Sequence, residues 1–167
     1  MMKYLIIIVW FSIYSVKGLA FDFKLQPGEL KYLPKYCHAK LDPSIQDTIA
    51  RDLFGHENSM HMHHYCAGLA YMKRGDRAIG LNPVKRQSLY KKGAGEIGYL
   101  ESRMSPGFRI KHELFYFKGY ALLKADKDIE AVQYLQKSIS VNPKYLKAHR
   151  QLFDYYFYLK QYDTAEE

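Results

Sequence analysis

The chain has 167 residues, of which 25 are Lys or Arg and 17 are Asp or Glu, and its formal net charge is +8. This length allows one or two small domains, and a hydrophobic share of 48% with 16% aromatic residues excludes a disordered or low-complexity protein. The excess of basic residues favours acidic partners, but the net charge does not show where on the protein the positive charge lies.

The N-terminus has the pattern of a secretory signal peptide. Ten of the twelve residues from Leu5 to Val16 are apolar, Lys3 precedes them, and a Gly-Leu-Ala sequence follows. A membrane anchor is the competing interpretation, but the run is shorter than the about 20 apolar residues that span a bilayer, and Lys17 interrupts it. We therefore expect residues 1–20 to be removed and the protein to be periplasmic or secreted.

Export gives the two cysteines, Cys37 and Cys66, an oxidising environment in which a pair commonly forms a disulfide. Such a bond would tie the N-terminal segment to the first long helix and stabilise the fold by about 3 kcal/mol. Two separate buried thiols are the alternative interpretation, because free cysteines pack as small hydrophobic residues.

The rest of the chain is predicted to be helical. Asp42 as N-cap, Pro43 at the first helical position and apolar residues at four-residue spacing predict a short helix that ends at Gly55. Hydrophobic periodicity predicts further helices over residues 61–74, 88–104, 111–124, 128–141 and 146–160, with a turn at Gly75-Asp76. No stretch alternates apolar and polar residues over the length of a strand. Short connections between helices favour antiparallel neighbours, so we expect an all-α fold.

One sequence period of about 34 residues covers 112–145, with Phe115, Gly119 and Leu122 in its first helix, Ala131, Leu135 and Ser138 in its second, and Pro143 at its end. This pattern resembles the tetratricopeptide repeat (TPR) family. Gly119 and Ala131 are small, which lets the two helix axes approach, while the larger residues fill the space around that contact.

Two weaker matches flank this unit. The matching residues are Leu152, Tyr156, Tyr162 and Ala165 in residues 146–167, and Gly68, Tyr71 and Gly75-Asp76 in a degenerate unit over residues 61–111. Phe153 departs from the family, which has a small residue there, and an insertion at 79–86 displaces the second helix of the degenerate unit. The resemblance implies antiparallel helix pairs stacked as a right-handed superhelix, preceded by an N-terminal segment, residues 21–60, with one short helix.

The resemblance also implies a scaffold without catalysis that binds a peptide or another protein on its concave face. The residues at the family's groove positions are Glu113, Tyr116, Tyr120 and Leu123, followed by Lys147, Arg150, Asp154 and Phe157. Lys147 and Arg150 suit a carboxylate, so the partner is expected to be acidic. The alternative is that these residues are a solvated face or pack on neighbouring helices.

The positive charge is concentrated in one stretch. Residues 73–111 hold ten Lys and Arg against three acids, and the four cations that mark the expected basic surface are Lys85, Arg86, Lys91 and Lys92. Because nucleic acid is not expected outside the cell, this surface favours an anionic envelope polymer, lipid headgroups or an acidic protein. A solvated face without a partner is the alternative.

A cluster of soft ligands offers a second function. The run from Met60 to Cys66 contains His61, Met62 and His64, and imidazole with sulfur ligands suits copper. Ordinary packing and a disulfide at Cys66 compete with this interpretation. No cofactor is expected, because the GxGxxG spacing at 93–98 lacks a preceding strand and no catalytic motif is present, which disfavours an enzyme.

Overall fold

The computed structural model describes residues 23–78, 80 and 82–159, so the predicted signal peptide lies outside the described residues. Every regular element in this part of the chain is a helix, which confirms the all-α prediction. The elements are the 3₁₀ turns η1 (Leu30–Tyr32) and η2 (Lys35–Cys37), and the helices α1 (His38–Leu41), α2 (Ile49–Arg77), α3 (Pro83–Glu101), α4 (Lys111–Leu123), α5 (Asp128–Val141) and α6 (Leu146–Tyr158). None of the described helices is long and apolar enough to cross a membrane.

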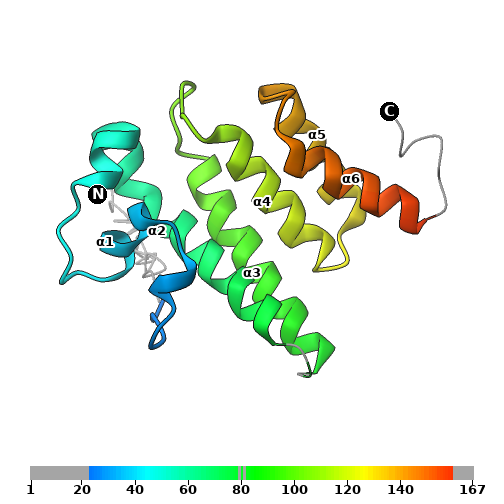
Figure 1. Ribbon diagram of the computed structural model, residues 1–167, viewed down its shortest axis with the longest axis horizontal. Coiled ribbons are helices and arrows are strands. Elements are labelled where there is room, and N and C mark those ends of the chain that lie inside the picture. The colour runs from blue at the N-terminus through cyan, green and yellow to red at the C-terminus, as the bar shows by residue number, and fades with distance from the viewer. Residues whose placement is uncertain (1–22, 79, 81, 160–167) are drawn as a thin grey trace, which may run out of the picture.

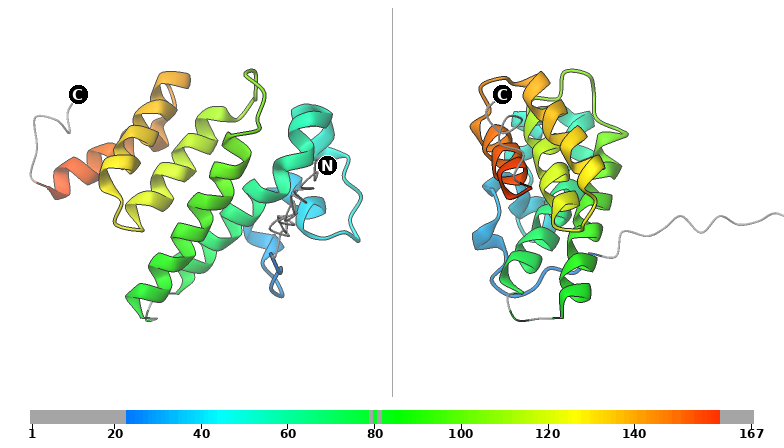
Figure 2. Two further views of the ribbon diagram at one scale, coloured as in Figure 1. Left: turned by 180° about the vertical axis from the view of Figure 1, so that it is seen from behind. Right: turned by 90° about the vertical axis from the view of Figure 1, so that its right-hand side faces the viewer.

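The five longer helices lie side by side in chain order (Figure 1). Each of α2 to α5 packs on the helix that follows it, and α4 also touches α2 on one side and α6 on the other. The end-on view of Figure 2 shows the N-terminal segment and α6 on the same side of the molecule, opposite α3. The helices alternate between two layers, and α2, α4 and α6 share the layer that faces the N-terminal segment.

Small residues set the distance between paired helices. A Cβ atom on Gly68 of α2 would lie 3.0 Å from the carbonyl oxygen of Gly93 in α3, and one on Gly119 of α4 would lie 3.0 Å from that of Ala131 in α5. Such contacts leave no room for a side chain, so these glycines allow the helices to approach closely. The expected role of Gly119 is confirmed, and the GxGxxG spacing at 93–98 lies within α3.

The predicted core of residues 112–145 is confirmed. Each matching helix position is buried, namely Phe115, Gly119, Leu122, Ala131, Leu135 and Ser138. The Ser138 hydroxyl donates to the carbonyl of His112 at 2.7 Å and joins the two helices. In α6 only Ala148 is buried. Phe153 is 43% exposed and stacks on Phe157 with ring centroids 5.7 Å apart, so its large ring does not enter the helix contact. Tyr162 and Ala165 lie outside the described residues.

The N-terminal segment is fastened to α2 at two places. The expected disulfide between Cys37 and Cys66 is present, and both residues are fully buried. Farther along α2, Arg74 donates to both carboxylate oxygens of Glu29 at 2.6 and 2.7 Å, and its guanidinium lies over the rings of Phe23 and Tyr71. The segment therefore lies along α2 as a fixed part of the fold.

Four expected boundaries were wrong. No helix begins at Asp42, whose carboxylate instead accepts from the amide and hydroxyl of Ser44 in a turn, and α2 begins at Ile49. Gly55 has φ 75° and kinks the helix there, but α2 continues to Arg77, so Gly75-Asp76 is helical and not a turn. Helix α3 begins at Pro83, where the Asn82 side chain accepts from the amide of Val84.

Candidate functional site

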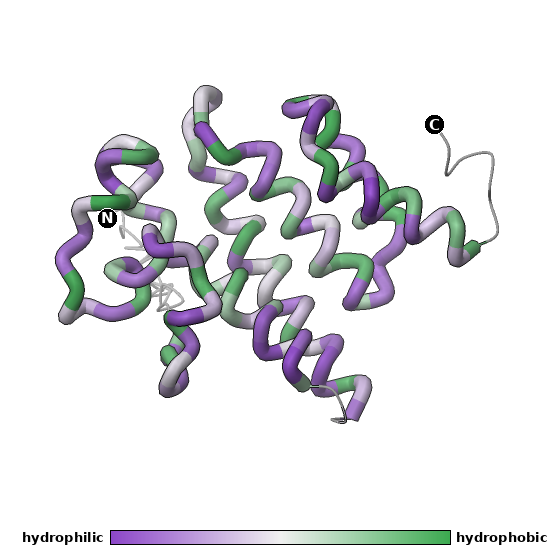
Figure 3. The backbone as a smooth tube through the Cα atoms, viewed as in Figure 1, coloured by the Kyte–Doolittle hydropathy of each residue, from purple (hydrophilic) through white to green (hydrophobic). Residues whose placement is uncertain are grey.

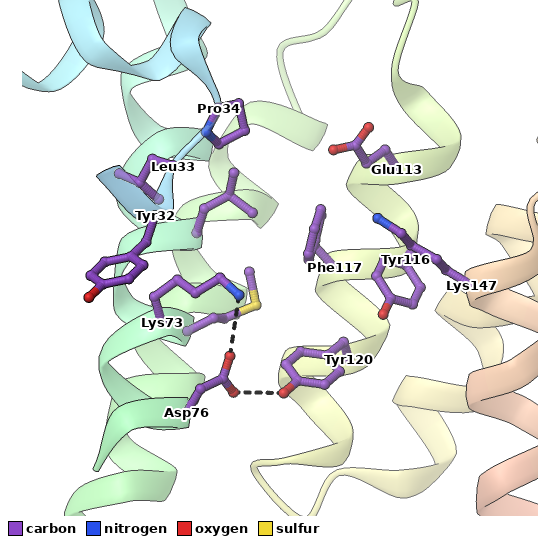
Figure 4. Close-up of a pocket in the computed structure, with 12 residues that line it drawn as sticks. Tyr32, Leu33, Pro34, Lys73, Asp76, Glu113, Tyr116, Phe117, Tyr120 and Lys147 are labelled. Atoms are coloured by element: carbon purple, nitrogen blue, oxygen red, sulfur yellow. Dashed lines mark hydrogen bonds and ion pairs between the residues drawn. The ribbon is translucent and has the colours of Figure 1, made fainter. Parts of the chain in front are cut away.

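A groove of about 440 Å³ lies between the N-terminal segment and the layer of α2, α4 and α6. Its floor is apolar and is formed by Leu33 of the N-terminal segment, Leu69 and Met72 of α2, and Phe117 of α4. Tyr32, Tyr116 and Tyr120 add aromatic surface around this floor (Figure 4). Its volume lies within the range of clefts that hold ligands.

One end of the groove is organised by Asp76. A single oxygen of this carboxylate accepts from the hydroxyls of Tyr90 at 2.8 Å and Tyr120 at 2.7 Å, and the other lies 3.7 Å from Lys73 Nζ. Burial and the hydrogen bond to Asp76 raise the pKa of Tyr90 to about 12, and the same causes raise the pKa of Tyr120. Both phenols therefore stay protonated at neutral pH and hold the carboxylate in place.

The other end is organised by Glu113, in the first turn of α4. Its carboxylate accepts from the hydroxyl of Tyr65 at 3.2 Å, and Tyr65 is fully buried. After burial, the charge of Glu113 is the next cause that raises the pKa of Tyr36 and of Tyr145. The hydroxyl of Tyr145 is buried and has no hydrogen-bond partner among the described residues. A fixed carboxylate thus lies among several phenols at this end.

The groove brings together four of the eight expected binding residues: Glu113, Tyr116, Tyr120 and Lys147. Figure 4 shows Lys147 reaching into the groove from the first turn of α6. The other four residues lie elsewhere. Leu123 and Asp154 line a separate hollow between α4 and α6, Arg150 is exposed with its guanidinium 3.9 Å from Asp154, and Phe157 stacks on Phe153. The expected carboxylate contact through Arg150 therefore does not belong to this groove.

Sequence reasoning missed the walls that α2 and the N-terminal segment contribute. Tyr32, Leu33 and Pro34 line the groove because the Cys37–Cys66 disulfide holds the segment against α2. The predicted disulfide was the one signal that could have placed this segment beside the groove. Lys73 and Asp76 were not predicted because a Gly-Asp pair is typical of a turn that ends a helix, whereas α2 continues through this pair.

The four expected basic residues lie on the first turns of α3. Lys85, Lys91 and Lys92 are exposed, Arg86 is partly exposed, and none of the four forms an ion pair with another described residue. Figure 3 shows hydrophilic residues gathered where α2 ends and α3 begins. This basic end is separate from the groove.

The residues of the expected copper site are dispersed. Cys66 is committed to the disulfide, and Met62 is fully buried in the core. His64 Nδ1 lies 2.6 Å from Glu96 Oε2, and its ring stacks on Tyr99 with centroids 3.6 Å apart. Burial lowers the pKa of His61. No group of three or more His, Cys, Asp or Glu residues in the described part of the chain has the arrangement of a metal site. Ordinary packing accounts for these contacts.

Comparisons of the chain with models of protein families, with curated proteins and with solved structures find no match. The groove and the chemistry of its lining residues are therefore the basis for assigning a function.

Proposed function

We propose that the protein is an exported scaffold that binds an extended segment of another protein or a peptide in the groove between its N-terminal segment and α2, α4 and α6. The observation that carries this proposal is the continuous lining of apolar floor and tyrosine walls, which suits alternating contacts with side chains and main chain. The proposal assigns the protein no catalysis of its own.

The arrangement of the helices is proposed to be TPR-like. Two observations support this proposal: the spacing of small and large residues over 112–145, and the contacts of α4 with both α2 and α6 in one layer. In such a stack, alternate helices line a concave face that holds extended ligands. The disulfide is compatible with an oxidising compartment, which supports the proposed export.

A displayed library of random twelve-residue peptides tests the proposed function. Peptides selected on the oxidised protein, residues 21–167, should bind in the groove. The double variant Tyr32→Ala/Lys73→Ala changes two exposed lining residues, so it should weaken binding about tenfold or more without lowering the thermal midpoint.

The matched control is Gln133→Ala/Gln136→Ala, because both glutamines are exposed on α5 away from the groove. This control should bind the selected peptides as the wild type does. Failure to select any peptide, or equal loss of binding in both double variants, would contradict the groove as the binding site.

A further inference from the structure

The fixed charges in the groove are carboxylates. Asp76 and Glu113 lie at its two ends, and each accepts a hydrogen bond from a buried tyrosine, Tyr90 and Tyr65 respectively. The two cations of the lining, Lys73 and Lys147, are exposed and sit on long flexible stems. A ligand therefore meets carboxylates that are held by hydrogen bonds and ammonium groups that can change position.

Several tyrosines lie close to the carboxylate of Glu113, because Tyr65 donates to it and its charge helps raise the pKa of Tyr36 and Tyr145. The Tyr116 ring lies edge-on to Tyr145, with centroids 5.5 Å apart, and to Phe117, with centroids 5.0 Å apart. Phe117 in turn lies edge-on to Tyr65 at 6.4 Å. Perpendicular rings present both faces and edges to the space between them, and ring faces attract cations. A carboxylate among such rings is the chemistry of a site for an ammonium or guanidinium group.

Lys147 shows where such a group would lie. Figure 4 shows its side chain entering the groove from α6, with its nitrogen between Glu113 and Tyr116. Its ammonium nevertheless forms no ion pair within 4.0 Å among the described residues. Because the Lys147 ammonium has no ion-pair partner among the described residues, a ligand cation that binds Glu113 can displace it with little loss of free energy.

We infer that the groove selects a peptide segment carrying a basic side chain, Arg or Lys, whose cationic group binds Glu113 between the aromatic rings in place of Lys147. This inference rests on the proposed function. It reverses the acidic partner expected from the sequence, because Arg150 lies outside the groove. Apolar residues beside the basic one would fill the floor formed by Leu69, Met72 and Phe117.

Three labelled pentapeptides test the inference, each with leucine on both sides of the central residue. The central residue is arginine, its neutral isostere citrulline, or glutamate, and binding is measured by fluorescence anisotropy at low and high salt. The arginine peptide should bind about tenfold more tightly than the citrulline peptide, because a partly buried charged hydrogen bond contributes about that much. This preference should shrink as salt rises.

Two variants assign the preference to particular residues. Glu113→Gln keeps the shape of the side chain and its bond from Tyr65, and it should abolish the preference for arginine over citrulline. Lys147→Met removes the competing cation and should tighten binding of the arginine peptide. The matched controls, Glu130→Gln and Lys137→Met, change exposed residues of α5 and should leave both peptides unaffected.

The outcomes separate this inference from the proposed function. Equal binding of all three peptides, tighter binding of the glutamate peptide, or weaker binding of the arginine peptide to Lys147→Met would overturn the cationic selection and leave the groove as a peptide site. No binding by any of the three, together with failure of the peptide selection, would overturn both.

Discussion

Replacing Gly68 by Ala tests whether backbone contact sets the spacing of α2 and α3. The added Cβ would lie 2.8 Å from Ile97 Cγ1 and 3.0 Å from the Gly93 carbonyl oxygen. The Ile97 side chain can change its rotamer, but the Gly93 carbonyl is part of a helix backbone and can move only if the helix moves. Overpacking of this kind costs about 2–3 kcal/mol. Ala has a higher helix propensity than Gly, which offsets about 1 kcal/mol of this cost. We therefore expect Gly68→Ala to lower the free energy of unfolding by about 1–2 kcal/mol.

Gly95→Ala is the matched control, because Gly95 also lies within a helix but has nothing within 4 Å of its Cβ position. This variant should gain about 0.5–1 kcal/mol from helix propensity alone. Urea unfolding of both oxidised proteins, followed by circular dichroism, should lower the midpoint by about 0.5–1 M for Gly68→Ala and raise it for Gly95→Ala. If Gly68→Ala were as stabilising as its control, the close approach would be refuted.

Two further perturbations address the fastening of the N-terminal segment. Cys37→Ala/Cys66→Ala opens a link between residues 29 positions apart and should lower the free energy of unfolding by about 2–4 kcal/mol; an unchanged urea midpoint would contradict this. Burial raises the pKa of Glu29, but the hydrogen bonds and charge of Arg74 outweigh it, so the folded pKa lies below the ordinary value of a glutamate carboxyl. A carboxyl with a lowered folded pKa contributes stability above its unfolded pKa and loses it as pH falls through the folded value. The difference in stability between wild type and Glu29→Gln should therefore be widest at neutral pH and narrow below about pH 4.5; urea titrations at pH 7 and pH 3 with an equal difference would refute the pairing.

The helices of residues 112–145 could be predicted because their signal is local. Gly119, Ala131 and Leu135 recur at helical spacing, and each meets a residue of the same short unit. The start of α2 could not be predicted in this way. Asp42 has the residue type of an N-cap, but the same carboxylate closes a turn by accepting from Ser44, and the local sequence does not distinguish the two.

The candidate site was only partly predictable because half of it depends on distant contacts. Tyr116 and Tyr120 follow from the face of one helix, whereas the N-terminal wall depends on Arg74 meeting Glu29, 45 residues away in sequence. Gly75 resembled a turn residue, yet it is needed inside α2 because a Cβ there would lie 2.7 Å from the Tyr90 ring. For α6, the TPR positions expected from the sequence define one face of the helix but not which of its turns reaches the groove. Lys147 in the first turn lines the groove, and Arg150 lies outside it.

The position of Asp76 has a consequence for how binding specificity can diverge in such a protein. Its carboxylate belongs to α2 but accepts from Tyr90 of α3 and Tyr120 of α4, so it holds three helices together while it lines the groove. Glu113 accepts from Tyr65 of α2, and Lys147 forms no ion pair among the described residues, so neither is shown to join three helices as Asp76 does. In the proposed peptide site, ligand preference can therefore change by substitution at the Glu113 end, while the Asp76 end is constrained because the fold depends on it.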